Sequence, residues 1–167
     1  MENLVTYQAW ICLGTNLGDR LSNLETARER IKGSCGKIIA ESGIYESRSW
    51  GYESENEFYN QCIALNTRLD PLSLLQDLQL IEKEFGREKK NSGYEDRSLD
   101  LDILFYDDRI IEHSDLVIPH PHIAERMFVL RPLSEISPRK IHPVSGLTVE
   151  EMMTRCKDPV KVKRISS

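Results

Sequence analysis

The hydrophobic and polar residues of this chain alternate with two periods, one typical of strands and one typical of helices. Short apolar or alternating runs rich in β-branched and aromatic residues indicate strands. Apolar residues three and four positions apart, such as Leu75, Leu78 and Ile81, indicate a helix with one buried face. The pattern predicts strands over 7–13, 38–46, 58–67 and 99–106, and helices over 22–33 and 71–85.

Residues that start and stop helices mark the ends of both predicted helices. Ser22 and Glu25 are spaced as a capping box, and Gly33 is expected to end the first helix. Asp70 followed by Pro71 is typical of a helix start, because the first helical N–H has no partner in the helix and proline lacks it. These signals agree with the apolar pattern at both helices.

The predicted elements follow one another in the order β-α-β-β-α-β, which is the ferredoxin-like arrangement. We expect an α+β fold in which an antiparallel sheet carries both helices on one face. The residues after Tyr106 are numerous enough to cover part of the other face, and these C-terminal additions give a three-layer α/β/α sandwich. One domain is expected over 1–167. Smaller elements are predicted as a hairpin over 110–118, a mostly irregular stretch over 119–146 with helical pieces at 122–127 and 133–136, and a helix over 148–155.

Composition and charge limit the classes of function. The 167 residues carry a net charge of −5, whereas proteins that bind nucleic acid through its phosphates usually have a basic excess, so we expect no nucleic-acid partner. No apolar run is long enough for a membrane span, and the first residues lack a signal-peptide pattern. The four cysteines show no CxxC spacing, which disfavours zinc and fits a reducing compartment. We therefore expect a cytoplasmic protein without membrane contact.

Two aspartates lie within the last long predicted strand. Asp100 and Asp102 are two residues apart, so their side chains share one face, while Leu99, Leu101 and Ile103 point to the other. Neighbouring carboxylates on a buried strand repel each other and lose hydration, which is costly unless a cation lies between them. A hard divalent ion such as Mg²⁺, which also binds phosphate oxygens, fits this pair.

Basic residues precede the aspartate pair on a stretch that also carries Gly86 and Gly93. Cations beside a metal-binding carboxylate pair would neutralise the charge of a polyphosphate such as ATP. A chance D-x-D beside a solvated charged loop is the competing interpretation, and the two features together favour metal and polyphosphate binding. The basic residues are Arg87, Lys89, Lys90 and Arg97.

Six segments carry a resemblance to a known enzyme family. They occur in the family's order over about residues 7–155 and are far more specific than a D-x-D pair alone. The chain resembles the 6-hydroxymethyl-7,8-dihydropterin pyrophosphokinases of the folate pathway. The matching segments are L-G-T-N-L-G-D at 13–19, F-Y-N-Q at 58–61, I-E-K-E-F-G-R at 81–87, D-R-S-L-D-L-D-I-L at 96–104, I-P-H-P at 118–121 and E-R-M-F-V-L-R-P-L at 125–133.

The resemblance implies an enzyme that transfers pyrophosphate from MgATP to the hydroxymethyl group of 6-hydroxymethyl-7,8-dihydropterin and releases AMP. By this resemblance, Asp100 and Asp102 hold two Mg²⁺ ions that bridge the phosphates, and Arg87 and Arg97 contact the triphosphate. Positioning and charge stabilisation would then do most of the catalysis. The resemblance also implies a monomer whose ligands are small molecules.

The resemblance further implies two ligand subsites. In the pterin subsite, Phe58 and Phe128 would sandwich the ring, since a flat heteroaromatic ring gains from stacking and burial. Asn60 would hydrogen-bond the pterin edge, and Ser47 and Trp50 would lie beside it. The implied ATP-binding residues are Gln79, Glu82, Arg87, Lys89, Lys90, Tyr94, Arg97, Ile103, His120 and Arg126.

The chain departs from the family pattern at several loop positions. Tyr94 stands where tryptophan is common, and Glu95 and Asp96 replace a Gly-Pro pair, which makes that loop more acidic. Residues 47–50 replace a proline-bearing stretch, and Pro121 stands where an aromatic residue is common. These changes bear on loop closure and nucleotide affinity rather than on the reaction.

Two other functions remain open from the sequence. A different Mg-dependent phosphoryl or nucleotidyl transferase would share the aspartate pair but would not need Phe58, Asn60 and Phe128 as a set. A ligand-sensing ferredoxin-like module would bind its ligand without turnover, and it would have no need for buried carboxylates beside cations. Formation of AMP from ATP in the presence of the pterin distinguishes the pyrophosphokinase from an ordinary kinase, which forms ADP.

Overall fold

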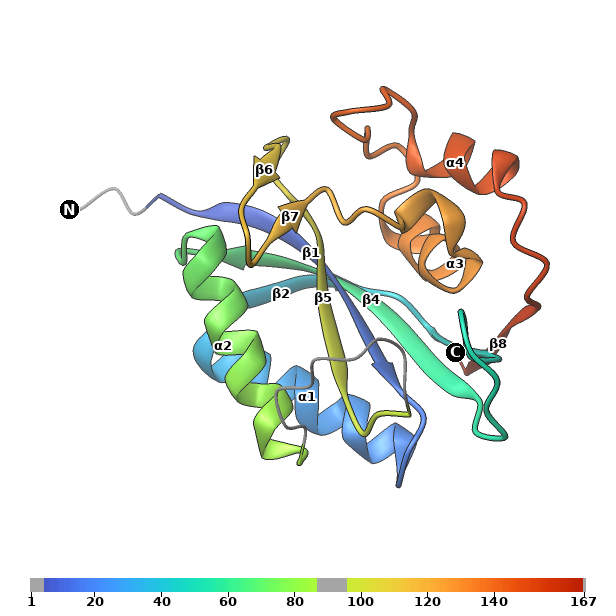
Figure 1. Ribbon diagram of the computed structural model, residues 1–167. Coiled ribbons are helices and arrows are strands. Elements are labelled where there is room, and N and C mark those ends of the chain that lie inside the picture. Colours follow the sequence, from blue (N-terminus) through green and yellow to red (C-terminus); the bar gives the residue numbers. More distant parts are fainter. Residues whose placement is uncertain (1–4, 87–95, 167) are drawn as a thin grey trace.

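A mixed α/β structure is built around one antiparallel sheet, as Figure 1 shows. The structure is a computed structural model, and it describes residues 5–86 and 96–166. The strands lie in the order β5-β1-β4-β3-β8, and β2 also pairs with β4. Each pair in this sheet is antiparallel. The strands are β1 (Tyr7–Thr15), β2 (Lys37–Glu41), β3 (Ile44–Ser47), β4 (Phe58–Thr67), β5 (Asp100–Tyr106) and β8 (Val162–Ser166).

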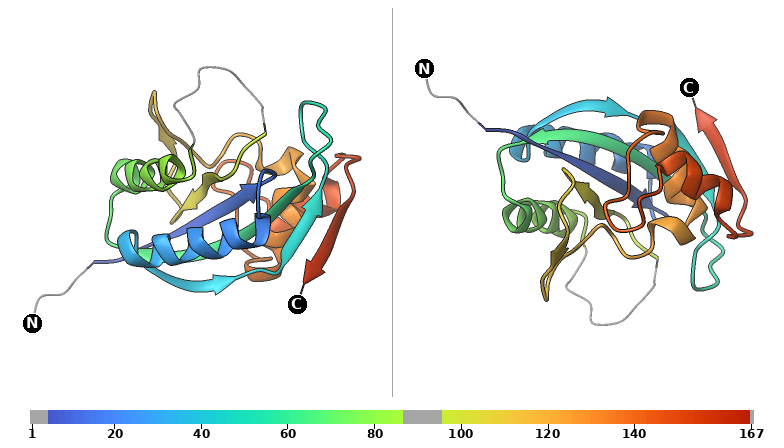
Figure 2. Two further views of the ribbon diagram at one scale, coloured as in Figure 1. Left: turned by 90° about the horizontal axis from the view of Figure 1, so that it is seen from below. Right: turned by 90° about the horizontal axis from the view of Figure 1, so that it is seen from above.

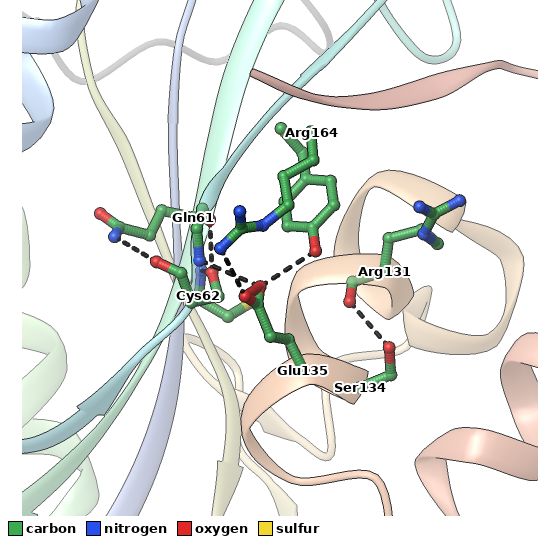
Figure 3. Close-up of polar contacts among 9 residues, drawn as sticks. Gln61, Cys62, Arg131, Ser134, Glu135 and Arg164 are labelled. Carbon is green, nitrogen blue, oxygen red and sulfur yellow. Dashed lines mark hydrogen bonds and ion pairs between the residues drawn. The ribbon is translucent and has the colours of Figure 1, made fainter. Parts of the chain in front are cut away.

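Three of the predicted strands are confirmed, and the single strand predicted over 38–46 is wrong. Two strands, β2 and β3, occupy that stretch and are separated by Ser42 and Gly43. The Gly43 N–H does not join the sheet but donates to Oε2 of Glu135 at 3.0 Å, and Figure 3 shows Glu135 also binding Arg164. The Ser42-Gly43 pair is the local signal of this break, and the carboxylate that binds it lies 92 residues further along. Strand β8 was not predicted either.

The first helix starts earlier than its sequence pattern suggested. In α1 (Arg20–Ser34), Asp19 is the N-cap, and its side chain accepts the Ser22 N–H at 3.1 Å. The predicted Ser22–Glu25 capping box is therefore wrong, since an ionised carboxylate both caps the helix and interacts favourably with its N-terminus. The helix also continues past Gly33 to Ser34, because one exposed glycine costs a helix only about 1 kcal/mol.

The second helix begins where the sequence predicted. In α2 (Pro71–Glu84), Asp70 is the N-cap and its Oδ1 accepts the Ser73 N–H at 2.9 Å. Gly86 follows the helix with φ of +82°, a conformation that suits glycine and stops the helix. The buried side chains of this helix include Leu74, Leu78 and Ile81.

The C-terminal region is more helical than its prolines suggested. The mostly irregular stretch predicted over 119–146 is partly wrong, because α3 (Met127–Ile136) runs through Pro132 without interruption. Its buried face, which includes Leu130 and Leu133, offsets the backbone hydrogen bond that proline cannot make. The predicted hairpin, the helical piece near 122–127 and the last helix are confirmed. These elements are β6 (Ile111–Glu112), β7 (Val117–Ile118), the short 3₁₀ helix η1 (Ile123–Glu125) and α4 (Val149–Arg155).

Helices cover both faces of the sheet, as Figures 1 and 2 show. On one face, α1 and α2 bury residues such as Leu24 and Leu78 against Leu101 of β5. On the other face, α3 and α4 pack against a second cluster that includes Phe105 and Leu133. Within the part of the chain that the structure describes, no helix is both long and apolar enough to span a membrane. The candidate site lies beside this second cluster, since Cys12 of the cluster and Phe128, which packs against it, also line the cavity described below.

Candidate active site

The strand register brings the predicted metal and pterin residues together. Gly14 on β1 lies directly between Asn60 on β4 and Asp100 on β5. In the neighbouring row, Cys12 on β1 lies beside Asp102 on β5. Because directly opposed residues of antiparallel strands point to the same face, these side chains gather at one end of the sheet. The aspartate pair and Asn60 therefore share one surface, which the sequence alone did not establish.

Gly14 leaves open space in the middle of this row. A Cβ atom at this position would lie 2.8 Å from Oδ1 of Asn60 and 3.8 Å from Cδ1 of Phe58. The first distance is shorter than real Cβ contacts, so any other residue would displace the Asn60 amide. Gly14 was not among the predicted site residues, because its role depends on the pairing of three strands rather than on a local pattern.

A cavity of about 430 Å³ opens above these strands, which is within the size range of small-molecule sites. It brings together ten of the residues predicted for the site and six that were not predicted. The predicted residues that line it are Ser47, Trp50, Phe58, Asn60, Arg97, Asp100, Asp102, His120, Arg126 and Phe128. The residues that were not predicted are Cys12, Gly14, Arg48, Tyr52, Pro121 and His122.

The alternation predicted for β5 is confirmed. Asp100 and Asp102 face the cavity, while Leu99, Leu101 and Ile103 are buried in the cluster under α1 and α2. The side chains of Asp100 and Asp102 keep 25% and 35% of their exposure, so a ligand in the cavity can reach both carboxylates.

The electrostatics of the aspartate pair favour a bound cation. Burial and the neighbouring charge of Asp100 raise the pKa of Asp102 to about 8, while Arg126 acts in the opposite direction. Burial and the repulsion of the pair thus outweigh the opposing charges of Arg126 and Arg97 on the pKa of Asp102. No group of three or more His, Cys, Asp or Glu within 5–86 and 96–166 is suited to hold a metal. Phosphate oxygens and water would have to complete the shell, as Mg²⁺ commonly requires.

Arg97 is fixed beside this pair by its side chain and by its backbone. Its Nη1 lies 3.0 Å from Oδ1 of Asp100. Its backbone N–H donates to Oδ1 of Asn16 at 2.7 Å, and its carbonyl accepts the Asn16 N–H at 2.9 Å. A guanidinium held at the cavity in this way can bind phosphate oxygens with its planar fork.

His120 presents an N–H group next to Asp102. Its Nε2 lies 3.9 Å from Oδ2 of Asp102. Burial, together with the charge of Arg126 and the proximity of His122, lowers the pKa of His120 to about 4, so the ring is neutral at pH 7. Nδ1 accepts the backbone N–H of His122 at 3.2 Å, which assigns the ring proton to Nε2. His120 can therefore donate a hydrogen bond into the cavity.

Aromatic and cationic side chains form another wall. The guanidinium carbon of Arg126 lies 4.5 Å from the ring centroid of Trp50 and 5.6 Å from that of Phe128. The Trp50 ring lies 5.6 Å from the ring of His122. Together with Phe58, these groups offer stacking and cation–π contacts that suit a flat polar heterocycle.

Asn60 is a buried polar residue that lines the same cavity. It is 2% exposed, and its Nδ2 donates to Oγ of Ser47 at 3.3 Å. Its Oδ1 lies over Gly14, since a Cβ there would meet this oxygen first. The amide is therefore held in one orientation, and it offers both a donor and an acceptor to a ligand edge.

Three other predicted residues that the structure describes, Gln79, Glu82 and Ile103, do not line the cavity. Glu82 is buried on α2, and its Oε2 accepts the Leu101 N–H at 2.8 Å, which fixes the edge strand between the two aspartates. Gln79 is exposed on α2, and the Ile103 side chain lies in the cluster under α1 and α2. The predicted residues Arg87, Lys89, Lys90 and Tyr94 lie outside the described residues.

Comparisons with known sequences identify one enzyme family. A family model described as 7,8-dihydro-6-hydroxymethylpterin-pyrophosphokinase matches residues 10–138. The 2-amino-4-hydroxy-6-hydroxymethyldihydropteridine pyrophosphokinase of Porphyromonas gingivalis is 39% identical over 137 residues, which cover 80% of this chain and 92% of that protein. The enzyme of the same name from Aquifex aeolicus is 38% identical over 142 residues, which cover 85% and 88%.

Longer proteins also match this chain. The folic acid synthesis protein fol1 of Pneumocystis carinii is 41% identical over 159 residues, which cover 94% of this chain and 21% of that protein, so the chain spans about a fifth of this relative. A crystal structure of wild-type HPPK-DHPS from Plasmodium falciparum superposes with a TM-score of 0.73 at 20% identity, and covers 93% of this chain and 44% of that one. The latter similarity shows a shared fold.

Proposed function

We propose that the cavity described above is the active site of a pyrophosphokinase. The chain belongs to the 7,8-dihydro-6-hydroxymethylpterin-pyrophosphokinase family, and it is therefore a pyrophosphokinase of folate biosynthesis that acts on hydroxymethyldihydropterin. The reaction takes pyrophosphate from ATP to the hydroxymethyl oxygen of 6-hydroxymethyl-7,8-dihydropterin and releases AMP. One observation carries the assignment of the site. A single cavity joins the aspartate pair and Arg97 to Asn60 and an aromatic wall.

The phosphate side of the cavity is formed by acidic and basic groups. Asp100 and Asp102 would hold two Mg²⁺ ions, which when bound supply charge neutralisation and make the attacking hydroxyl more acidic. Arg97 and Arg126 add positive charge there, and neutral His120 donates from Nε2 to a phosphate oxygen. As the bond between the hydroxymethyl oxygen and the β-phosphorus forms, the bond from that phosphorus to the bridging oxygen breaks, AMP leaves with that oxygen, and the hydroxyl proton passes to solvent.

The pterin side of the cavity is formed by aromatic residues and one amide. Phe58 and Phe128 would stack on the ring, and Trp50 would close the wall beside Arg126. Asn60 would bind the polar edge of the pterin, with Ser47 holding the amide in place. The protein's contribution is to bring the hydroxymethyl oxygen into line with the β-phosphorus and to exclude water.

We assign the finer features of the protein in the same way. The strand order β5-β1-β4 followed by β2 and β3, with α1 and α2 on one face, supports a ferredoxin-like βαββαβ core, and α3 and α4 complete a three-layer sandwich. We propose that residues 1–167 form a single domain that works as a cytoplasmic monomer, without nucleic acid. Gln79, Glu82 and Ile103, with Arg87, Lys89, Lys90 and Tyr94, remain proposed ATP contacts.

Product analysis tests the proposed reaction. The pure protein is incubated with MgATP and 6-hydroxymethyl-7,8-dihydropterin, and the nucleotides are separated by chromatography. We expect AMP, in a one-to-one ratio with the pyrophosphorylated pterin, only when the pterin is present. Formation of ADP would identify an ordinary kinase, and AMP formed without the pterin would identify a different ATP-cleaving reaction.

Replacing Asn60 with alanine tests the pterin subsite. We expect the Kd for the pterin to rise about tenfold to hundredfold, because buried groups that pair with a polar ligand edge discriminate strongly, while the Kd for ATP changes by less than about twofold. Titration calorimetry with each ligand alone measures both values. Asn66→Ala, six residues further along the same strand, is the matched control. Equal weakening of both ligands in Asn60→Ala would show that the subsites are wrongly assigned.

A further inference from the structure

The loop between β3 and β4, residues 48–57, forms one wall of the cavity. Trp50 and Tyr52 from this loop line the cavity, and the loop connects Ser47 to Phe58, which line it as well. The loop contains no helix or strand. Its position must therefore be set by contacts with other parts of the chain.

One carboxylate, that of Asp96, accepts two hydrogen bonds from this loop. Oδ1 of Asp96 accepts hydrogen bonds from Nδ2 of Asn16 at 2.8 Å and from the Tyr52 hydroxyl at 2.9 Å. Its Oδ2 accepts a hydrogen bond from Nδ2 of Asn56 at 3.0 Å. Although burial acts in the opposite direction, hydrogen bonds from these residues and Ser54 lower the pKa of Asp96, so the carboxylate is charged at neutral pH. Charged acceptors make stronger hydrogen bonds than neutral ones.

Asn16 extends this network to Arg97. The Asn16 side chain is 3% exposed, and its Oδ1 accepts the Arg97 N–H at 2.7 Å while its Nδ2 binds Asp96. The same Nδ2 lies 3.3 Å from the carbonyl oxygen of Asn56. One buried amide therefore links the end of β1, the 48–57 loop and the segment that carries Arg97. We call Asn16, Tyr52, Asn56 and Asp96 the Asp96 hub.

We propose that Asp96 is a positioning residue for pyrophosphoryl transfer, which holds the 48–57 loop and Arg97 in one fixed arrangement. Asp96 does not line the cavity, so it acts through the residues it binds. Tyr52 connects it to the loop wall that carries Trp50, and Asn16 connects it to the backbone of Arg97. The inference rests on the proposed function, in which the loop faces the pterin and Arg97 faces the phosphates.

The proposed role follows from the demands of the reaction. The hydroxymethyl oxygen and the β-phosphorus must approach in line, and a displacement of about 1 Å can lower the rate about a hundredfold. The loop wall and Arg97 come from segments more than 40 residues apart in the sequence, because the Tyr52–Asp96 contact spans 44 positions. The hub joins these two segments, because Tyr52 and Asn56 of the loop bind Asp96 and Asn16 binds the backbone of Arg97. Its loss should therefore affect both sides of the cavity.

Fluorescence quenching tests the hub without any substrate. The chain has two tryptophans, and Trp10 is only 6% exposed, so acrylamide quenching reports mainly on Trp50 in the loop. In Asp96→Ala we expect the quenching constant of Trp50 to rise about twofold, since the loop loses the hydrogen bonds that Tyr52 and Asn56 donate to Asp96. The Trp50→Phe variant gives the contribution of Trp10. Glu55→Ala, which removes an exposed carboxylate from the same loop, should leave quenching unchanged.

Steady-state kinetics test the link to catalysis. We expect kcat/KM for the pterin to fall at least about tenfold in Asp96→Ala and about fivefold in Tyr52→Phe, which keeps the ring but loses the hydroxyl. Because both changes break the same contact, the double variant should lose little more activity than Asp96→Ala alone. Asp96→Asn, which keeps the shape and one acceptor oxygen, should recover part of the activity. In Glu55→Ala the kinetics should not change.

The outcomes separate this proposal from the proposed function. If the protein forms no AMP with this pterin, the quenching experiment still decides whether Asp96 holds the loop. If Asp96→Ala is unfolded by circular dichroism, Tyr52→Phe supplies both measurements, because it leaves the carboxylate in place. The role of Asp96 would be overturned if Asp96→Ala and Tyr52→Phe both gave the same quenching constant and the same kinetics as Glu55→Ala. It would also be overturned if the loss of kcat/KM in the double variant equalled the product of the two single losses.

Discussion

Asp102→Ala is expected to lower kcat about a thousandfold or more while the protein remains folded. Asp102 and Asp100 are the only carboxylates that line the cavity among the described residues, so the loss of one removes half of the proposed protein ligands for Mg²⁺. Steady-state assays over a range of Mg²⁺ concentrations measure the effect, and calorimetric titration of Mg²⁺ with a non-hydrolysable ATP analogue measures the metal site directly. Asp115→Ala, an exposed aspartate outside the cavity, is the matched control. Near-normal turnover in Asp102→Ala would refute the metal assignment.

The raised pKa of Asp102 adds a stability measurement to this prediction. Burial and the charge of Asp100 raise the pKa to about 8 in the folded protein, whereas an unfolded aspartate titrates near pH 4. A carboxyl whose folded pKa is raised stabilises the fold fully below its unfolded pKa, and this contribution is lost as the pH rises through the folded pKa. With a chelator present, the unfolding free energy of the wild type should therefore fall between pH 5 and pH 8, relative to Asp102→Asn.

Urea unfolding at these two pH values measures that difference. The 35% exposure of the Asp102 side chain allows solvent to reduce the effect, so the direction of the change is the test rather than its size. Excess Mg²⁺ with ATP should bind the ionised pair and remove the pH dependence, because the cation replaces the missing positive charge. A wild type whose stability relative to Asp102→Asn is the same at both pH values would contradict the electrostatic account of the pair.

The sequence predicted the parts of the site that depend on local geometry. The alternation along 99–106 correctly placed Asp100 and Asp102 on one face and the apolar residues on the other, because a strand has a strict period of two. The same rule placed Phe58 and Asn60 together. Both pairs could be assigned to a face from a few adjacent residues, without knowledge of which strands are neighbours.

The parts that were missed depend on contacts between distant segments. Gly14 matters because three strands meet there in one register, and the backbone at the break in the 38–46 stretch binds the distant Glu135. The continuous helix α3 was missed because local proline signals outweighed the burial of its apolar face, which only the folded sheet reveals. Tyr52 lines the cavity because Asp96 holds its loop there, and nothing in the local sequence signals that contact.

Arg97→Ala is expected to lower kcat about a hundredfold while KM for the pterin changes by less than about threefold. Its guanidinium lies 3.0 Å from Asp100, and its backbone is held on both sides by Asn16, so its charge is fixed where the phosphates are proposed to bind. A preorganised charge of this kind stabilises the transition state more than it binds the pterin. Arg97→Lys should recover only part of the rate, because it keeps the charge but loses the planar fork.

The design of this experiment separates a phosphate contact from an indirect effect on the metal site. Removing Arg97 takes a positive charge away from Asp100, which should strengthen Mg²⁺ binding, so a rate loss that persists at saturating Mg²⁺ cannot come from a weakened metal site. Arg68→Ala, an exposed arginine just beyond the opposite end of β4, controls for the loss of one charge. A variant with normal kcat and a raised KM for the pterin alone would place Arg97 in the pterin subsite, because a residue that acts on the β-phosphorus must affect the chemical step.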